Sequence, residues 1–134
     1  MKITLCGSAR FEDLFHAWDK KLTLLGHVVY GLAVYPSFMG NQKEWYTAEE
    51  KTKLDLAHLA KIENSDCILV LNPEGYIGES TAREILWAQL QGKMVYYLEV
   101  TKAGQEDSSE LTDWGGWSAE AEPGSDGDST DGPL

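Results

Sequence analysis

Apolar residues fall along the chain in two patterns. Four short runs rich in apolar and β-branched residues are typical of strands, and they lie at residues 2–6, 28–34, 67–71 and 94–98. Between them, three longer segments repeat apolar residues at helical spacing, at about residues 10–25, 47–63 and 80–91. Strands that alternate with helices of this length predict an α/β fold with a parallel sheet covered on both faces.

The run CILVL at residues 67–71 is apolar without alternation, which is typical of a strand buried on both sides. With short loops and right-handed crossovers, the simplest strand order, numbered along the chain, is 2-1-3-4. This order places the loop CGSARF, after the first strand, beside the loop NPEGYIGEST, after the third strand. Both glycine-containing loops then face one crevice at the carboxyl ends of the strands, where open α/β sheets bind ligands.

Both loops have the chemistry of an anion site. In GYIGEST, Gly75 and Gly78 allow the backbone to approach a ligand closely, and a helix begins at about Ser80 and Thr81. Free amide groups and the positive end of the helix dipole favour a bound phosphate there. The first loop offers similar groups, namely Gly7, Ser8 and Arg10. The P-loop and dinucleotide-binding motifs do not occur in the sequence, so the expected ligand is a small nucleoside or mononucleotide.

Glu84 has two interpretations. The stretch from Thr81 to Glu84 matches a capping box, in which the carboxylate only bonds the helix N-terminus, and the motif alone favours this structural role. Alternatively, a carboxylate on the first turn of this helix points into the crevice and attacks a sugar carbon. The residue pattern does not choose between the two.

The preceding helix carries further polar candidates, provided that it approaches the crevice. His58 has Lys61 one turn further on and Asp55 one turn earlier. A lone histidine on a helix is more often a surface or packing residue, and a lysine is more often a solvated charge. Asp55 is the competing acid, and Tyr76 and Trp45 either stack on a base or simply pack.

Acidic residues are concentrated at the C-terminal end. The 134-residue chain has a formal net charge of -11, and residues 103–134 hold nine acidic residues and no Lys or Arg, so residues 1–102 carry a net charge of -2. The C-terminal segment is rich in Gly and Ser and lacks apolar periodicity, which predicts one domain over residues 1–102 and a disordered tail over residues 103–134. Trp114 and Trp117 in this tail are either stray aromatic residues or a short docking motif.

Composition argues against several classes of function. A nearly neutral domain with an acidic tail does not suit nucleic acid, because duplex binding depends on Lys and Arg. No run approaches the ~18 apolar residues of a membrane span, and the first apolar run is too short for a signal peptide. We therefore expect a cytoplasmic protein without a membrane partner. Cys6 and Cys67 fall in central strands, so we expect two buried free thiols and neither a metal site nor a cofactor.

Five segments of the chain resemble the nucleoside 2-deoxyribosyltransferase-like family, which includes nucleotide N-glycoside hydrolases. These segments are CGSARF, HLAKIENSD, CILVLN, GYIGESTAREILWA and GKMVYYL. The resemblance spans about residues 2–99 and implies a Rossmann-like three-layer sandwich. The motifs HxxKI and GYIGxST are similar to those of a phage or bacterial subgroup of this family.

The resemblance implies cleavage or transfer at the N-glycosidic bond of a nucleoside or nucleoside 5′-monophosphate. Family members use a Glu after the glycine loop as the nucleophile, and this position falls on Glu84. The family residues that hold the phosphate or sugar correspond to Gly7, Ser8, Gly78, Ser80 and Thr81, and we add Arg10, Lys61, Gly75 and Tyr76 as candidate binding residues. Where the family has an Asp that orients or protonates the base, this chain has His58. Either His58 or Asp55 therefore takes the acid role, or the reaction differs.

Two other functions remain open at this stage. In the first, the crevice binds a nucleotide without turnover, as a sensing or sequestering module. The presence of His58 where the family has an Asp favours this alternative. Otherwise the acidic tail makes the chain an interaction protein with a vestigial crevice. Family relatives assemble into dimers or larger forms, so the resemblance also implies a homo-oligomer.

Overall fold

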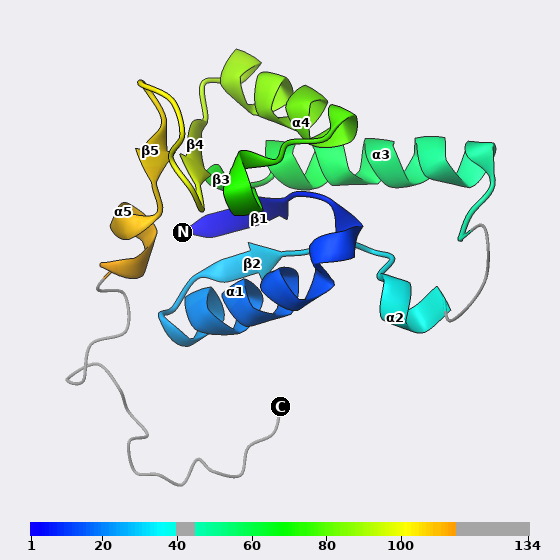
Figure 1. Ribbon diagram of the computed structural model, residues 1–134, viewed down its shortest axis with the longest axis horizontal. Helices are drawn as coiled ribbons and strands as arrows, with labels where there is room; N and C mark the ends of the chain where they lie inside the picture. The colour runs from blue at the N-terminus through cyan, green and yellow to red at the C-terminus, as the bar shows by residue number, and fades with distance from the viewer. Residues whose placement is uncertain (40–44, 115–134) are drawn as a thin grey trace, which may run out of the picture.

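The computed structural model describes residues 1–39 and 45–114, which form an α/β sandwich (Figure 1). The strands are β1 (Lys2–Cys6), β2 (Val28–Tyr30), β3 (Cys67–Val70), β4 (Met94–Tyr97) and β5 (Glu106–Asp107). The α-helices are α1 (Glu12–Leu24), α2 (Pro36–Met39), α3 (Ala48–Glu63), α4 (Glu79–Leu90) and α5 (Ser109–Thr112). Two 3-10 helices, η1 (Ala9–Phe11) and η2 (Pro73–Gly75), follow β1 and β3.

The strands form a single parallel sheet in the order β2-β1-β3-β4-β5. The predicted order 2-1-3-4 is thus confirmed, and β5 extends the sheet by one short strand. In β1 and β3 the register pairs Ile3 with Cys67 and Cys6 with Val70. The two strands therefore end side by side, and the loops that follow them begin at the same edge of the sheet.

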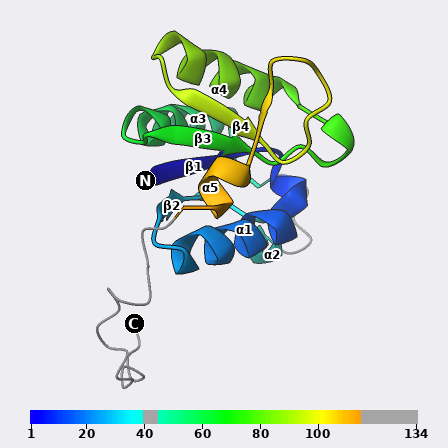
Figure 2. The ribbon, with the colours of Figure 1, turned by 90° about the vertical axis from the view of Figure 1, so that its left-hand side faces the viewer.

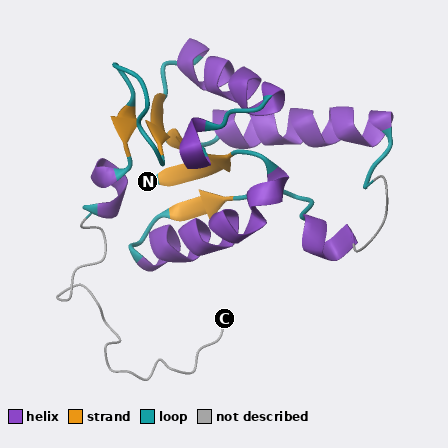
Figure 3. Ribbon diagram, in the orientation of Figure 1, coloured by secondary structure: helices purple, strands orange, loops and turns teal. Residues whose placement is uncertain are grey.

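Alternate residues of the central strands belong to two cores, one on each face of the sheet. Figure 2 shows the helices on the two sides of the sheet that enclose these cores. One core contains Ile3 and Leu5 of β1 packed with Phe15 and Leu22 of α1. The other contains Cys6 and residues of α3 and α4, among them Ile62 and Ala88. The helices α3 and α4 thus cover one face, α1 covers the opposite face, and the strands lie between them (Figure 3).

The helix boundaries follow from local chemistry at their ends. Thr47 caps α3: its hydroxyl accepts a bond from the Glu50 amide, and the Glu50 carboxylate accepts one from the Thr47 amide. These two reciprocal bonds form a capping box. The short helix α2 follows β2 at Pro36–Met39. Residues 40–44 lie outside the described residues.

The ordered domain extends further than the predicted boundary at residue 102. Leu111 of α5 is fully buried in the core on the α1 side of the sheet, and His27 Nε2 donates a hydrogen bond of 3.0 Å to its carbonyl oxygen. Trp114 lies against the His27 ring, with 5.2 Å between centroids. The prediction of a disordered tail is therefore wrong for the stretch through Trp114, because one buried leucine anchors a segment without apolar periodicity. Residues 115–134, including Trp117, lie outside the described residues.

Two further expectations concern the thiols and the membrane. Cys6 and Cys67 are both buried and free, as predicted. None of the helices in the described part of the chain is long and apolar enough to cross a membrane.

Candidate functional site

A cavity of about 430 Å³ opens beside the carboxyl ends of β1 and β3, between the loop after β1, α3 and the start of α4. Most of the candidate residues line it: Gly7, Ser8, Arg10, Asp55, His58, Lys61, Tyr76, Gly78, Ser80, Thr81 and Glu84. Gly75 does not line this cavity. It lies in a tight turn at the end of η2, where its φ is +80°. A Cβ added to Gly75 would lie only 3.1 Å from Thr101 Cγ2.

The loop after β1 is held close to the end of β3. A Cβ on Gly7 would lie 2.9 Å from the Leu71 carbonyl oxygen, a backbone atom that cannot move aside easily. Ser8 then caps the 3-10 helix by accepting a 3.3 Å bond from the Arg10 amide. The glycine therefore allows the two loops to meet at one edge of the sheet and form one wall of the cavity.

The start of α4 leaves backbone donors available at the cavity. Gly78 is the N-cap and has no side chain to cap the helix, and the first amide groups of any helix have no intrahelical acceptor. Among the described residues no side chain accepts from these amides. Thr81 also lines the cavity, and it is only 4% exposed. These groups together offer hydrogen bonds to an anionic or hydroxylated ligand.

Glu84 does not cap its helix. Because α4 begins at Glu79, Thr81 lies inside the first turn and Glu84 in the second, and the cap residue Gly78 receives no side-chain bond. The structure therefore does not bear out the capping-box interpretation of Thr81 and Glu84, one of the two that the residue pattern left open. The carboxylate instead lies on the cavity floor, with its side chain 13% exposed.

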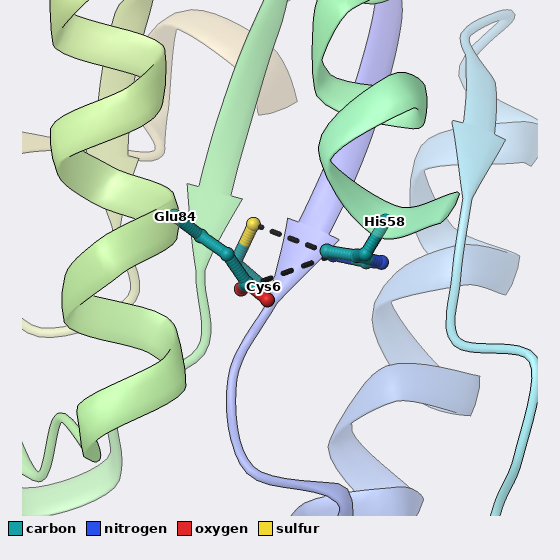
Figure 4. A group of neighbouring side chains, drawn as sticks. All are labelled: Cys6, His58 and Glu84. Carbon is teal, nitrogen blue, oxygen red and sulfur yellow. Dashed lines mark hydrogen bonds and ion pairs between the residues drawn. The ribbon is translucent and has the colours of Figure 1, made fainter. Parts of the chain in front are cut away.

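Three side chains from three elements converge on that floor (Figure 4). Cys6 comes from the end of β1, His58 from α3 and Glu84 from α4. His58 Nε2 lies 3.7 Å from Cys6 Sγ and 3.9 Å from Glu84 Oε1. We call Cys6, His58 and Glu84 the buried polar cluster.

Burial shifts the pKa values in this cluster towards the neutral form of each group. It raises the pKa of Glu84 to about 7, an effect that a hydrogen bond from the Cys6 thiol partly offsets. Burial, reinforced by the positive charge of Lys61, lowers the pKa of His58 to about 4. The pKa of the Cys6 thiol is raised well above its usual value by the same loss of solvation. Near neutral pH the imidazole is therefore uncharged, the thiol is protonated, and Glu84 is poised between its two forms.

The hydrogen bonding of His58 fixes its tautomer. Its Nε2 lies 3.1 Å from the Leu5 carbonyl oxygen, which can only accept, so Nε2 carries the proton. The same nitrogen faces Cys6 and Glu84, so the imidazole does not bridge them as the base of a nucleophilic triad does. Near neutral pH the thiol and the imidazole are both neutral, and Glu84 is the member of the cluster whose charge changes. To bind a metal ion through these three residues, the thiol and Nε2 would both have to give up a proton.

Charged residues surround the cluster in the cavity. Both carboxylate oxygens of Asp55 accept from Lys51 Nζ, at 3.2 and 3.1 Å. Lys61 Nζ donates a 2.7 Å bond to the Gly31 carbonyl oxygen, and burial lowers the pKa of this lysine. The Arg10 guanidinium lies over the Tyr76 ring, 4.2 Å from its centroid.

Sequence reasoning missed Cys6 and Lys51 as parts of this site. Cys6 is the last residue of β1, directly before the glycine loop, and this position at the carboxyl end of a central strand was the available signal. Lys51 stands four residues before Asp55 on α3, a spacing that places two side chains on one helix face. Trp45, Tyr46 and Glu79 also line the cavity, and only Trp45 was a candidate.

Comparisons with known proteins bear on the fold. No family model matches the chain, and no curated protein sequence matches it. Among solved structures it is similar to a 2-deoxyribosyltransferase from Bacillus psychrosaccharolyticus, with a TM-score of 0.54 and 20% identity over 85% of this chain and 82% of that one. It is also similar to the Clostridium botulinum CMP N-glycosidase BcmB, with a TM-score of 0.48 and 17% identity over 87% and 84% of the two chains. The chain shares the α/β fold of the first of these proteins.

Proposed function

We propose that this protein is an enzyme that cleaves or transfers at the N-glycosidic bond of a nucleoside or nucleoside 5′-monophosphate, with Glu84 as the nucleophile. The observation that carries the proposal is the placement of Glu84: a buried carboxylate on the floor of the cavity, free of any capping role. A carboxylate with little solvation is a stronger nucleophile once it is ionised. The fold shared with a 2-deoxyribosyltransferase is compatible with this role.

The residues around Glu84 suit a sugar and its phosphate. Ser8, Ser80 and Thr81 provide hydroxyl groups, and the first turn of α4 provides backbone amides. Arg10 provides a positive charge on the same side of the cavity. Such groups bind a phosphate or the hydroxyl groups of a ribosyl ring.

The reaction has two steps. Glu84 attacks C1′ as the bond to the base breaks, through a transition state with oxocarbenium character, and an ester between Glu84 and the sugar results. Water or a second base then attacks C1′ and releases the carboxylate. Of the two residues considered for protonating the departing base, His58 is the less suitable, because its Nε2–H is bonded to the Leu5 carbonyl and its pKa is lowered to about 4. We assign His58 to positioning, through its contacts with Cys6 and Glu84.

A panel assay tests the proposal. The purified protein is incubated with ribonucleosides, deoxyribonucleosides and their 5′-monophosphates, with and without an acceptor base, and free base is measured by chromatography. We expect base release from at least one substrate and a loss of at least ~10³-fold in Glu84→Gln, because the covalent step is removed. Glu63→Gln, an exposed carboxylate on α3 outside the cavity, is the matched control and should keep full activity. Equal activity of Glu84→Gln and the control would refute the nucleophile assignment.

The pH dependence of the reaction is a second test. Glu84 must be ionised to attack, so kcat/KM should rise as the pH increases through about 7, where burial has placed the pKa of Glu84. The groups that face it and enter this balance are Cys6, Asp55, Lys51 and Arg83. A kcat/KM that is already level from pH 5 upward would contradict a nucleophile with this raised pKa.

A nucleotide-binding module without turnover is the second candidate function. It is favoured by His58, whose hydrogen bond to Leu5 leaves it unable to protonate a leaving base. This alternative predicts that substrates of the panel raise the melting temperature in stoichiometric amounts and stay intact. Base release that depends on Glu84 would exclude it.

A further inference from the structure

We propose that the site takes N-glycosides whose base carries a positive charge, such as a pyridinium or an N7-alkylated purine, on a ribosyl 5′-monophosphate. This inference rests on the proposed function and narrows its substrate class. A neutral base needs a proton in order to leave the sugar. The inference depends on which groups of the cavity could supply that proton.

When a neutral base departs from C1′, it takes the electron pair of the C1′–N bond and becomes an anion, so it needs a proton to be a good leaving group. A cationic base becomes neutral when it takes this electron pair, so it needs no proton. As the Glu84 oxygen bonds to C1′, the C1′–N bond breaks, its electron pair goes to the ring nitrogen, and the positive charge of the base is cancelled. Water then attacks C1′, the ester bond to Glu84 breaks, and one proton passes to the solvent. Neither step uses an acid.

The side chains nearest to Glu84 are poor proton donors to a leaving base. The Cys6 thiol hydrogen-bonds to Glu84 itself, and burial raises its pKa well above the usual value. His58 Nε2–H is directed at the Leu5 carbonyl oxygen at 3.1 Å, and the side chain is only 7% exposed. Its lowered pKa agrees with a neutral ring that stays neutral. In its ion pair, Asp55 uses both carboxylate oxygens to accept from Lys51, so it is an acceptor and not a donor.

The remaining ammonium groups of the cavity are held by other acceptors. Lys51 donates to Asp55, and Lys61 donates to the Gly31 carbonyl oxygen at 2.7 Å. Among the described residues, the arrangement around Glu84 is therefore suited to a bond that breaks without acid assistance.

The lining of the cavity also suits a positively charged ring. Trp45, Tyr46 and Tyr76 add aromatic rings to the lining, and Glu79 adds a carboxylate. Aromatic faces attract planar cations. The Tyr76 ring already has a planar cation stacked on it, because the Arg10 guanidinium lies 4.2 Å from the ring centroid.

The anionic end of such a substrate has its own partners. The first turn of α4 offers backbone amides that no side chain of the described residues caps, and the nearly buried Thr81 lines the cavity beside them. Arg10 adds a positive charge beside them. A 5′-phosphate fits this end of the cavity, and a cationic base fits the aromatic and acidic part.

The test uses a matched pair of nucleotides that differ by one methyl group and one charge: 7-methylguanosine 5′-monophosphate and guanosine 5′-monophosphate. Nicotinamide mononucleotide serves as the pyridinium probe. Because the methylated nucleotide is intrinsically more labile, each kcat/KM is divided by the uncatalysed rate of the same compound in the same buffer. Enzymes with a general acid gain about 10²- to 10⁴-fold from it on neutral bases. We expect this enzyme to lack that gain, so that the normalised value for the methylated nucleotide exceeds that of its neutral partner by at least ~10-fold.

Asp55→Asn separates the remaining interpretations. If no acid acts, Asp55→Asn changes the kcat/KM values for both nucleotides by a similar factor, and this result supports the inference. A selective loss with guanosine 5′-monophosphate, or equal normalised values for the pair in the wild-type protein, overturns it and leaves the proposed function standing. If no compound of the pair or the wider panel releases base in a manner that depends on Glu84, the proposed function and this inference both fail.

Discussion

Glu84 and His58 are neighbours whose pKa values burial shifts in opposite directions. The pKa of Glu84 is raised from its ordinary value of 4.5 to about 7, and the pKa of His58 is lowered from 6.5 to about 4. A raised carboxyl pKa gives stability that is present below pH 4.5 and is lost as the pH rises through 7. A lowered histidine pKa gives stability that is present above pH 6.5 and is lost as the pH falls through 4. The two contributions therefore have opposite slopes between pH 4.5 and 6.5.

Glu84→Gln should expose the first contribution. The neutral amide avoids the cost of ionising a buried group, so its stability relative to the wild type should increase as the pH rises from 4.5 to 7. The increase approaches roughly 3 kcal/mol as an upper limit. Urea unfolding at a series of pH values measures it, with Glu63→Gln as the exposed control. A difference between Glu84→Gln and the wild type that is independent of pH would contradict the raised pKa.

His58→Asn should expose the second contribution. At neutral pH the variant loses the bond to the Leu5 carbonyl and is destabilised by about 1–3 kcal/mol. The deficit should shrink as the pH falls from 6.5 towards 4, because the wild type must then protonate a buried imidazole and the variant does not. The control is His16→Asn, which alters an exposed imidazole on α1. A deficit that grows in acid would show that the imidazole is stabilised by protonation.

At the residue scale, sequence patterns identified Glu84, His58 and the glycines as candidates but did not relate them to one another. Cys6 and His58 are 52 residues apart in the chain, and their contact depends on how α3 packs across β1. The pKa values depend on the same packing. Local motifs carry no information about such contacts. For the same reason, the residue pattern alone did not decide between a capping and a catalytic role for Glu84.

At the scale of elements, the strand order followed from the alternation of strands and helices and from short loops, and the structure confirms it. The two-residue strand β5 and the four-residue helix α5 were missed. Neither has an apolar run or a helical repeat, and both are held by contacts with distant parts of the chain, such as the Tyr96 hydroxyl that donates to the Glu110 carboxylate at 2.6 Å.

The approach of β1 to β3 makes a prediction about Gly7. Gly7→Ala places a Cβ 2.9 Å from the Leu71 carbonyl oxygen and should destabilise the protein by about 1–3 kcal/mol, because a backbone atom must shift. Gly31→Ala is the comparison, since the nearest atom there is the hydroxyl at the end of the Tyr35 side chain, which can move. Thermal or urea unfolding of both variants measures the contrast. Equal stability of Gly7→Ala and the wild type would mean that the loop has room to spare.

At the scale of the whole molecule, the C-terminal boundary of the domain is testable. A chain ending at residue 102 lacks Leu111, which is fully buried in the core, and should lose about 2–5 kcal/mol. A chain ending at residue 114 retains Leu111 and its bond to His27 and should unfold at nearly the same urea concentration as the full chain. If both truncated chains were equally stable, the domain would end at residue 102, as the composition predicted.

Self-association is a prediction of the same scale. Leu56, Leu86 and Leu90 are exposed on α3 and α4, and Trp87 Nε1 is buried without an acceptor among the described residues. We expect a second copy of the chain to cover this face, so light scattering should give a dimer or larger form and Leu90→Glu should shift it towards the monomer. The exposed Leu24→Glu on α1 is the control. A wild-type monomer at all concentrations would contradict the expectation.

Intact-protein mass spectrometry after rapid acid quenching of turnover would detect a covalent bond between Glu84 and the sugar. We predict a mass increase equal to the glycosyl group, located by peptide mapping at Glu84 and missing in Glu84→Gln. Base release with no adduct on the quenched protein, or an adduct on another residue, would contradict it.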